Sequence, residues 1–279
     1  MRLSRALFTL ALVVAISGLA LAGAELVPGI DTEARVSSQL TVRRITPRAL
    51  VFTHERPFPA NSLLVEVADG SLVLCSTPYS EDATRELLDW ARCHLGRRRL
   101  VAINPHFHAD GVGGNPDLLA EGIPVYGSDL TARYLRERGE ASRRQGLEVL
   151  RDDPADQALV RAIRLVPADH TFAAEKGLRL SFGGESVEAI YPGPAHAPDN
   201  VVVWFPSQGI LFGGCMILGG PRPVNVADAD LKSWPAAIGR LLELHPAIVV
   251  PGHGRHLSPA LLPHTLLAVE RYVAEHPVP

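Results

Sequence analysis

The most restrictive feature of this sequence is a set of four apolar, strand-like runs, each leading into a turn with a side chain able to bind a metal ion. The four turns read PHFHADG, YPGPAHAP, GGCM and PGHG. The apolar runs have to be buried, and loops from both halves of the chain must converge if their side chains act together. The sequence therefore requires a fold in which distant strand ends meet at one place.

Strand-like and helical segments alternate along the chain. Strands are predicted at 62–67, 71–75, 99–104, 123–127, 186–191, 200–206, 209–214 and 247–254, and helices at 80–96, 116–122, 233–245 and 258–275. Segment 129–165 is helical in character and dense in charge, so it is predicted to be a solvated helical surface without chemistry of its own. The alternation indicates an α/β fold with helices covering the sheets, and no linker divides residues 23–279, which we expect to form a single domain.

The N-terminal residues have the three-part pattern of a secretory signal peptide. Arg2 and Arg5 precede an apolar run that extends to about Ala22 and ends in small residues. We expect a signal peptide of residues 1–22, with cleavage at the latest after residue 24, a mature protein outside the cytoplasm and no stable membrane anchor. An uncleaved membrane anchor is the alternative interpretation of the same residues.

The composition excludes some partners and makes a disulfide framework unexpected. The formal net charge is −3 and 47% of the residues are hydrophobic, which suits a globular protein and gives no basic patch for nucleic acid. Three cysteines are an odd number for an exported protein, so at least one thiol has another role. Cys75 and Cys93 lie on a predicted strand and a predicted helix, where they are either buried apolar residues or bridged to each other.

The turn after the strand at 99–104 carries the pattern His-x-His-x-Asp. Alternate residues of an extended chain point the same way, so His106 and His108 face one cavity together, and Asp110 follows them if the backbone stays extended. Imidazole nitrogen and carboxylate oxygen are both suitable ligands for zinc. The three later turns add further candidate ligands, namely His196, Cys215 and His253.

Six such ligands suit two zinc ions. Each ion would have three protein ligands and open positions for water and substrate, which is the pattern of a catalytic site and not of a structural one. A zinc held by neutral histidines keeps its charge, acidifies bound water and polarises a carbonyl group. A zinc held by Asp110 and the Cys215 thiolate is largely neutralised, and it suits a leaving nitrogen or a bridging oxygen.

The chain resembles a class B metallo-β-lactamase of the subclass with one three-histidine zinc and one Asp-Cys-His zinc. The resemblance runs from about residue 48 to about residue 275, and it rests on the ordered motifs HFHADGVGGN, PGPAHAPDNVVVWFP, LFGGCMI, NVADADLKSWP and VVPGHG. The segments CSTPYS and SDLTARYL and the helical insert look like the São Paulo type of this family, whereas NVADAD looks like the Verona type.

The resemblance implies an αβ/βα four-layer sandwich, the metallo-β-lactamase fold, with its active site at the edge between two β-sheets. It implies two Zn²⁺ ions per chain, the first at His106, His108 and His196 and the second at Asp110, Cys215 and His253. A metal-bound hydroxide would attack the β-lactam amide, Asn225 would stabilise the oxyanion, and Asp110 would orient the nucleophile. The expected protein is a periplasmic, monomeric enzyme of antibiotic resistance that opens penicillins, cephalosporins and carbapenems.

The sequence departs from this family at positions that support the substrate or the metal. Leu218 stands where the family has a lysine for the substrate carboxylate, and Arg222 either supplies that charge or is an exposed loop residue. Ser76 replaces a frequent aspartate behind the metal site, a change shared with the São Paulo type. A short segment takes the place of the family's mobile loop, and its His54 and Phe58 are interpreted as surface residues unless they contact substrate.

Two other functions are open alternatives. Thioesterases and lactonases of the same fold resemble the pattern HxHxDH and use a bridging aspartate, whereas here Gly111 follows Asp110 and Cys215 stands in the bridging position. A non-catalytic, secreted zinc-binding protein is the second alternative, but metal storage has no use for an oxyanion donor such as Asn225.

Overall fold

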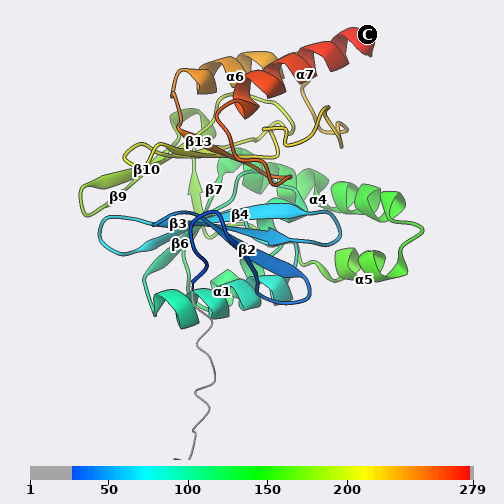
Figure 1. The fold of residues 1–279 in the computed structure, drawn as a ribbon. Coiled ribbons are helices and arrows are strands. Elements are labelled where there is room, and N and C mark those ends of the chain that lie inside the picture. The colour runs from blue at the N-terminus through cyan, green and yellow to red at the C-terminus, as the bar shows by residue number, and fades with distance from the viewer. Residues whose placement is uncertain (1–26, 277–279) are drawn as a thin grey trace, which may run out of the picture.

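The computed structural model describes residues 27–276, which form two β-sheets packed between two layers of helices (Figure 1). The larger sheet has eight strands in chain order, namely β1 (Glu33–Arg35), β2 (Leu40–Thr46), β3 (Ala49–His54), β4 (Ala60–Glu66), β5 (Leu72–Cys75), β6 (Leu100–Ile103), β7 (Val125–Ser128) and β8 (His170–Phe172). The smaller sheet has five, in the order β13 (Ile248–Pro251), β12 (Ile210–Gly214), β11 (Val202–Phe205), β10 (Glu185–Ile190) and β9 (Leu178–Phe182). The predicted αβ/βα four-layer sandwich is confirmed.

The direction of each strand pair determines how the chain connects it. Strands β1 to β5 are antiparallel, whereas β5 to β8 are parallel and need crossover connections because parallel strands cannot be joined by a tight turn. The crossovers contain α1 (Glu81–Leu95), α2 (Ala109–Val112), α3 (Asn115–Ala120), α4 (Asp129–Val149) and α5 (Pro154–Ala162). Helix α6 (Trp234–Leu242) connects the parallel strands β12 and β13, a short 3-10 turn (Ala174–Lys176) precedes β9, and α7 (Leu261–Glu275) ends the described chain.

The main apolar core lies between the two sheets. Leu63 and Ile103 from the larger sheet are in one buried cluster with Phe212 from the smaller sheet. The outer faces are covered by helices, with Leu87 of α1 under the larger sheet and Trp234 of α6 above the smaller one (Figure 1). The core and the helices thus cover both faces of both sheets. The loops that follow β6, β12 and β13 meet at one edge of the sandwich.

Each predicted helix and strand has a counterpart in the structure, but five strands and the short helix α2 were not predicted. Strands β1, β2, β3, β8 and β9 were not predicted; β2, for example, carries two adjacent arginines, Arg43 and Arg44, within its seven residues. Segment 129–165 forms the helices α4 and α5, which separate before Pro154. The prediction that this segment is only a solvated surface is wrong, because one face of α4 lines the cavity described below.

The three cysteines are free thiols, of which Cys75 and Cys215 are buried and Cys93 is exposed. The structure therefore has no Cys75–Cys93 bridge, and the expectation that Cys93 is a buried apolar residue is wrong, because it lies on the solvent side of α1. The predicted signal peptide, residues 1–22, and its cleavage site lie outside the described residues. Among residues 27–276, no helix combines the length and the hydropathy needed to cross a membrane.

Candidate metal centre

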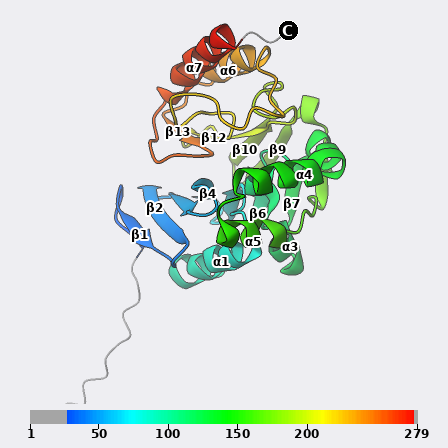
Figure 2. The same ribbon diagram turned by 90° about the vertical axis from the view of Figure 1, so that its right-hand side faces the viewer.

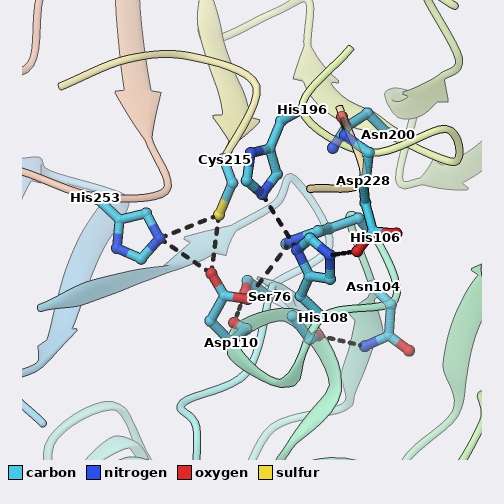
Figure 3. Close-up of polar contacts among 12 residues, drawn as sticks. Ser76, Asn104, His106, His108, Asp110, His196, Asn200, Cys215, Asp228 and His253 are labelled. Atoms are coloured by element: carbon cyan, nitrogen blue, oxygen red, sulfur yellow. Dashed lines mark hydrogen bonds and ion pairs between the residues drawn. The ribbon is translucent and has the colours of Figure 1, made fainter. Parts of the chain in front are cut away.

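The predicted ligands come from both sheets and gather at one edge of the sandwich (Figure 3). His106 and His108 follow β6 of the larger sheet, whereas Cys215 follows β12 and His253 follows β13 of the smaller one. His196 lies in the loop after β10. The convergence of distant loops that the sequence required is thus present in the structure.

Hydrogen bonds join the two sheets at this edge. The Val201 N–H donates to the carbonyl of Pro105 at 2.7 Å, directly before the His-x-His-x-Asp segment. The side-chain amide of Asn61, on β4, donates to the carbonyl of Pro251 at the end of β13, at 3.0 Å. Each bond joins a residue on or beside the larger sheet to one on or beside the smaller sheet. Together they hold the loops that carry the candidate ligands next to each other.

Asp110 lies in the first turn of α2, so the backbone does not stay extended as far as this residue. The turn is closed by the Gly113 N–H, which donates to the carbonyl of Ala109 at 2.8 Å. Ser76, whose φ is 66°, donates its hydroxyl hydrogen to the Asp110 carbonyl at 2.7 Å. Ser76 therefore supports the backbone that carries the Asp110 side chain, as Figure 3 shows.

Asp110, Cys215 and His253 form one tight contact group. Oδ2 of Asp110 lies 2.9 Å from Sγ of Cys215 and 3.1 Å from Nε2 of His253. Nδ1 of His253 donates to the carbonyl of Pro59 at 2.7 Å, so Nε2 is the ring nitrogen that faces the group, and a metal ion would take the place of a proton there. Gly252 has no room for a side chain, because a Cβ there would lie 2.7 Å from Sγ of Cys215. Donor atoms of these three ligands lie within 4.8 Å of one another, a set that suits a divalent metal such as zinc.

His106, His108 and His196 face one another with ring centroids 4.8, 5.5 and 5.1 Å apart in pairs. Their donor atoms group as His106/His108/Asp110 and as His106/His196/Cys215, so His106 is shared. Both ring nitrogens of His106 are buried and lack a hydrogen-bond partner among the described residues. An unsatisfied buried imidazole is costly unless a ligand takes its lone pair, so the histidine side of the cluster also fits a metal ion.

Burial disfavours the charged form of two of the imidazoles, whereas at His253 the hydrogen bond and the charge of Asp110 together outweigh burial and raise the pKa. Burial lowers the pKa of His106 to about 3 and the pKa of His196 well below its usual value. Burial also raises the pKa of the Cys215 thiol, and the charge of Asp110 raises it further. Burial alone would raise the pKa of Asp110, but the imidazoles of His106 and His253 outweigh it and hold this pKa well below its usual range. The thiol therefore donates to a carboxylate, and a cation that displaces the thiol proton would satisfy both groups.

The cluster opens into a cavity of about 890 Å³. The predicted substrate-binding residues all line it, with Asn225 and Arg222 on an exposed loop and Leu218 only 7% exposed. The Leu218 N–H donates to Oγ1 of Thr265 on α7 at 3.0 Å, which fixes this part of the wall. Position 218 therefore gives the cavity an apolar surface and no charge.

One face of α4 lines the same cavity and contacts the loop between β12 and α6 at two points. Nε2 of Gln145 donates to Oδ1 of Asn225 at 3.2 Å. Arg138, two helical turns earlier, donates to Oδ1 of Asp228 at 3.2 Å, and Oδ2 of Asp228 lies 3.1 Å from Nε2 of His108. Figure 3 shows the Asp228 carboxylate directed at the His108 ring.

Three residues, Asp228, Arg138 and Gln145, were not predicted from the sequence to be functional. The buried His54 was also interpreted as a surface residue. Asp228 lies within the motif NVADAD, so its position beside Asn225 was a usable signal. The other two lie on a helix whose cavity face has no apolar stripe. His54 is buried at the end of β3 and its Nδ1 accepts the Tyr79 N–H at 3.3 Å, so its interpretation as a surface residue is wrong.

Comparison with known proteins gives relatives that match most of the chain. The family model described as the metallo-beta-lactamase superfamily matches residues 56–253. The metallo-beta-lactamase type 2 of Bacillus cereus is 32% identical over 212 residues, which cover 75% of this chain and 72% of that protein. The protein of the same name from Bacteroides fragilis is 29% identical over 219 residues, 77% of each chain.

This chain also aligns with solved structures of similar proteins over nearly the whole length of those proteins. A metallo-beta-lactamase from Pontibacter korlensis superposes with a TM-score of 0.67 at 32% identity, over 83% of this chain and 99% of that one. The crystal structure of the DIM-1 metallo-beta-lactamase exposed to ceftazidime superposes with a TM-score of 0.65 at 26% identity, over 84% of this chain and 98% of that one.

Proposed function

This chain belongs to the metallo-beta-lactamase superfamily, and from that premise we propose that it is a zinc-dependent hydrolase that opens the amide bond of β-lactams. The observation that carries the proposal is the Asp110–Cys215–His253 contact group, which lines the cavity beside an unsatisfied, buried His106. Curated relatives with the name metallo-beta-lactamase type 2 support the enzyme class.

The donor set is divided between two proposed zinc sites. One ion would be held by His106, His108 and His196, and a second by Asp110, Cys215 and His253. When bound, zinc supplies a Lewis acid that polarises a carbonyl and lowers the pKa of water. This division is that of the subclass with a three-histidine and an Asp-Cys-His site, and the Asp110, Cys215 and His253 group supports it.

The side chains around the metal ligands have separate proposed roles. Asp110 is ionised at neutral pH, and its Oδ1 lies 3.5 Å from Nε2 of His106, between the two halves of the cluster. We assign it to orient the attacking water and to take its proton. Oδ1 of Asn225 accepts a hydrogen bond from Gln145. Its Nδ2 is therefore left to donate to the lactam oxygen as negative charge develops there. Arg222, exposed at the rim, is proposed to pair with the substrate carboxylate.

The finer assignments also remain proposals. Likeness to the São Paulo type is supported by the CSTPYS and SDLTARYL segments and by the helical insert, and the Verona-like feature is NVADAD. A cleaved signal peptide, a single mature domain, a periplasmic location and a role in resistance are proposed from the N-terminal pattern and the substrate class. We propose a monomer that acts on penicillins, cephalosporins and carbapenems.

The test is hydrolysis by the purified chain. We expect turnover of a chromogenic cephalosporin, loss of turnover on chelation and recovery with added zinc, with one penicillin and one carbapenem defining the range. A bound-metal count should approach two per chain, and the variant Cys215→Ser should lower that count. Turnover of a thioester or a lactone by the zinc-loaded protein, with no turnover of any β-lactam, would show that the thioesterase or lactonase alternative is right.

A further inference from the structure

The cavity extends well beyond the metal cluster, along the pair of helices α4 and α5. Figure 2 shows the two helices side by side, next to the larger sheet. The wall that they and the following segment present is apolar: Leu150, Val160 and Ile163 are 8%, 5% and 4% exposed, and Leu165 lies next to them. Val149, on the last turn of α4, lines the cavity while it is 66% exposed, so the apolar surface continues to the rim.

Gly146 opens this part of the cavity. It lies in the interior of α4, where glycine is disfavoured relative to every residue except proline. A Cβ at Gly146 would meet only Cγ1 of Val160, at an ordinary contact distance of 4.0 Å. By contrast, a Cβ at Gly139 would lie 3.0 Å from Cδ1 of Leu165, so close packing explains that glycine. Packing does not explain Gly146; its missing side chain leaves the space in front of Val160 open.

The wall is fixed to both rims of the cavity by polar contacts that lie outside the apolar surface. Gln145 holds α4 to the Asn225 loop, as described above. On the other side, Nε of Arg56 donates to Oδ1 of Asp156 at 2.6 Å and ties α5 to the loop before β4. Arg143 also lines the cavity, but its guanidinium donates to Glu140 at 2.5 Å and to the backbone carbonyl of Ile163 at 3.3 Å. The polar groups therefore position the wall and leave an apolar recess between them.

We infer that this recess, formed by Gly146, Leu150, Val160 and Ile163, binds an apolar, aryl-bearing substituent of the cyclic amide substrate and so determines specificity. The inference rests on the proposed function, because the occupant is part of the molecule whose amide lies at the metal cluster. Three observations favour it: the recess is continuous with the cluster, it is apolar to its rim, and the whole cavity has the volume of a site for a drug-sized ligand. A small or strongly polar substituent would leave this surface without a partner.

The test fills the recess and compares two substrates with the same ring. Gly146→Leu projects a side chain toward Val160, and Gly146→Ala is a milder change with ordinary contact distances if the leucine variant folds poorly. Ala141→Leu, on the exposed side of the same helix, is the matched control. The substrates are a penicillin with a phenylacetyl side chain and the corresponding unacylated penicillin nucleus.

The inference predicts that wild type prefers the phenylacetyl substrate in kcat/KM and that Gly146→Leu reduces this preference about tenfold, through KM, while the nucleus is unaffected. Gly146→Ala should reduce it less, and Ala141→Leu not at all. Calorimetry measures the affinity of the same phenylacetyl substrate, benzylpenicillin, for chelator-treated protein that does not turn it over. The affinity should fall from wild type and Ala141→Leu to Gly146→Ala and further to Gly146→Leu. If wild type hydrolyses both substrates but Gly146→Leu and Gly146→Ala leave their ratio unchanged, the recess inference fails and the proposed function stands. If the zinc-loaded wild type hydrolyses no β-lactam, the chromogenic cephalosporin included, the proposed function fails, and the inference with it.

Discussion

At the scale of single residues, two imidazoles of the candidate metal centre, His253 and His108, have a hydrogen-bond partner that orients the ring. Nδ1 of His253 donates to the Pro59 carbonyl, so Nε2 is the ring nitrogen that faces the candidate metal site. At His108 the order is reversed, because Nε2 faces Asp228 and Nδ1 lies 3.2 Å from Nε2 of His196. Such partners determine which nitrogen carries the proton and how basic the ligand is.

The Asp228 carboxylate is expected to strengthen metal binding through His108. Asp228→Asn keeps an oxygen acceptor but removes the negative charge, so zinc affinity should fall about 10–100-fold. Arg138→Gln, which removes the second partner of Asp228, should cause a smaller loss. Competition with a chromophoric chelator measures both affinities. An Asp228→Asn variant that binds zinc as tightly as wild type would show that this contact has no influence on the ligand.

Gln145 is expected to act as a positioning residue for Asn225. Removal of an oxyanion donor typically costs about 10²–10³ in kcat, and loss of its orientation should cost less, about tenfold for Gln145→Leu. Gln145→Glu should cost more than Gln145→Leu, because the carboxylate accepts from Nδ2 and draws the donor away from the substrate. In an Asn225→Ala background both changes should have no further effect on kcat. Additive losses in that double-mutant cycle would contradict the coupling.

The convergence of the candidate ligands was predictable from the sequence because these residues are marked locally. His106 and His108 have the alternate spacing of an extended chain, and Cys215 and His253 follow glycines at strand ends. The Asp228–His108 contact was not predictable in this way, because it joins residues 120 positions apart and depends on how the loop after β12 returns to the cluster.

At the scale of elements, helix α4 shows why the insert was misjudged. A cavity-lining face is normally recognised by apolar residues at helical spacing, but here that face carries Gly139, Ser142 and Gly146, which give no hydropathy signal. The buried positions of α4 are few, at Thr131, Leu135 and Gly139, so most of the helix has the charged pattern of a solvated surface. The functional face is defined by small residues and by what lies opposite them.

Gly146→Ala is expected to stabilise the protein by roughly 0.5–1 kcal/mol. Alanine is favoured over glycine in a helix interior by about this amount, and the new Cβ meets only Val160 at 4.0 Å. Gly139→Ala should gain less or lose stability, because Leu165 would have to move. Urea unfolding of the three proteins measures the difference. Equal changes at both glycines would mean that the local packing of α4 does not separate them.

At the scale of the whole molecule, the candidate metal centre lies across the contact between the two sheets. Asp110 follows β6 of the larger sheet, whereas Cys215 and His253 follow strands of the smaller one. A metal ion bound by all three would connect the two halves of the sandwich, and any ligand that binds only the folded state stabilises that state. The same edge therefore serves both the fold and the proposed chemistry.

His54 should make the stability of the whole protein depend on pH below neutrality. Burial lowers its pKa from 6.5 to about 4, although the nearby charges of Glu55 and Asp156 oppose the shift. The unfolded chain therefore takes up a proton at His54 before the folded chain does. The contribution of His54 to the free energy of unfolding is fully present above pH 6.5. It is lost as the pH falls from about 6.5 to about 4, by about 3 kcal/mol in total.

His54→Asn isolates this contribution, because the asparagine Oδ1 can accept the Tyr79 N–H as Nδ1 does but carries no titrating charge. Urea unfolding of chelator-treated wild type and variant at pH 7 and pH 4.5 measures the free energy of unfolding of each. The metal ligands titrate in both proteins, so only the difference between them reports on His54. We expect the loss on acidification to be smaller in the variant by about 2–3 kcal/mol. Parallel losses in the two proteins would mean that His54 reaches solvent and titrates with its ordinary pKa in the folded state.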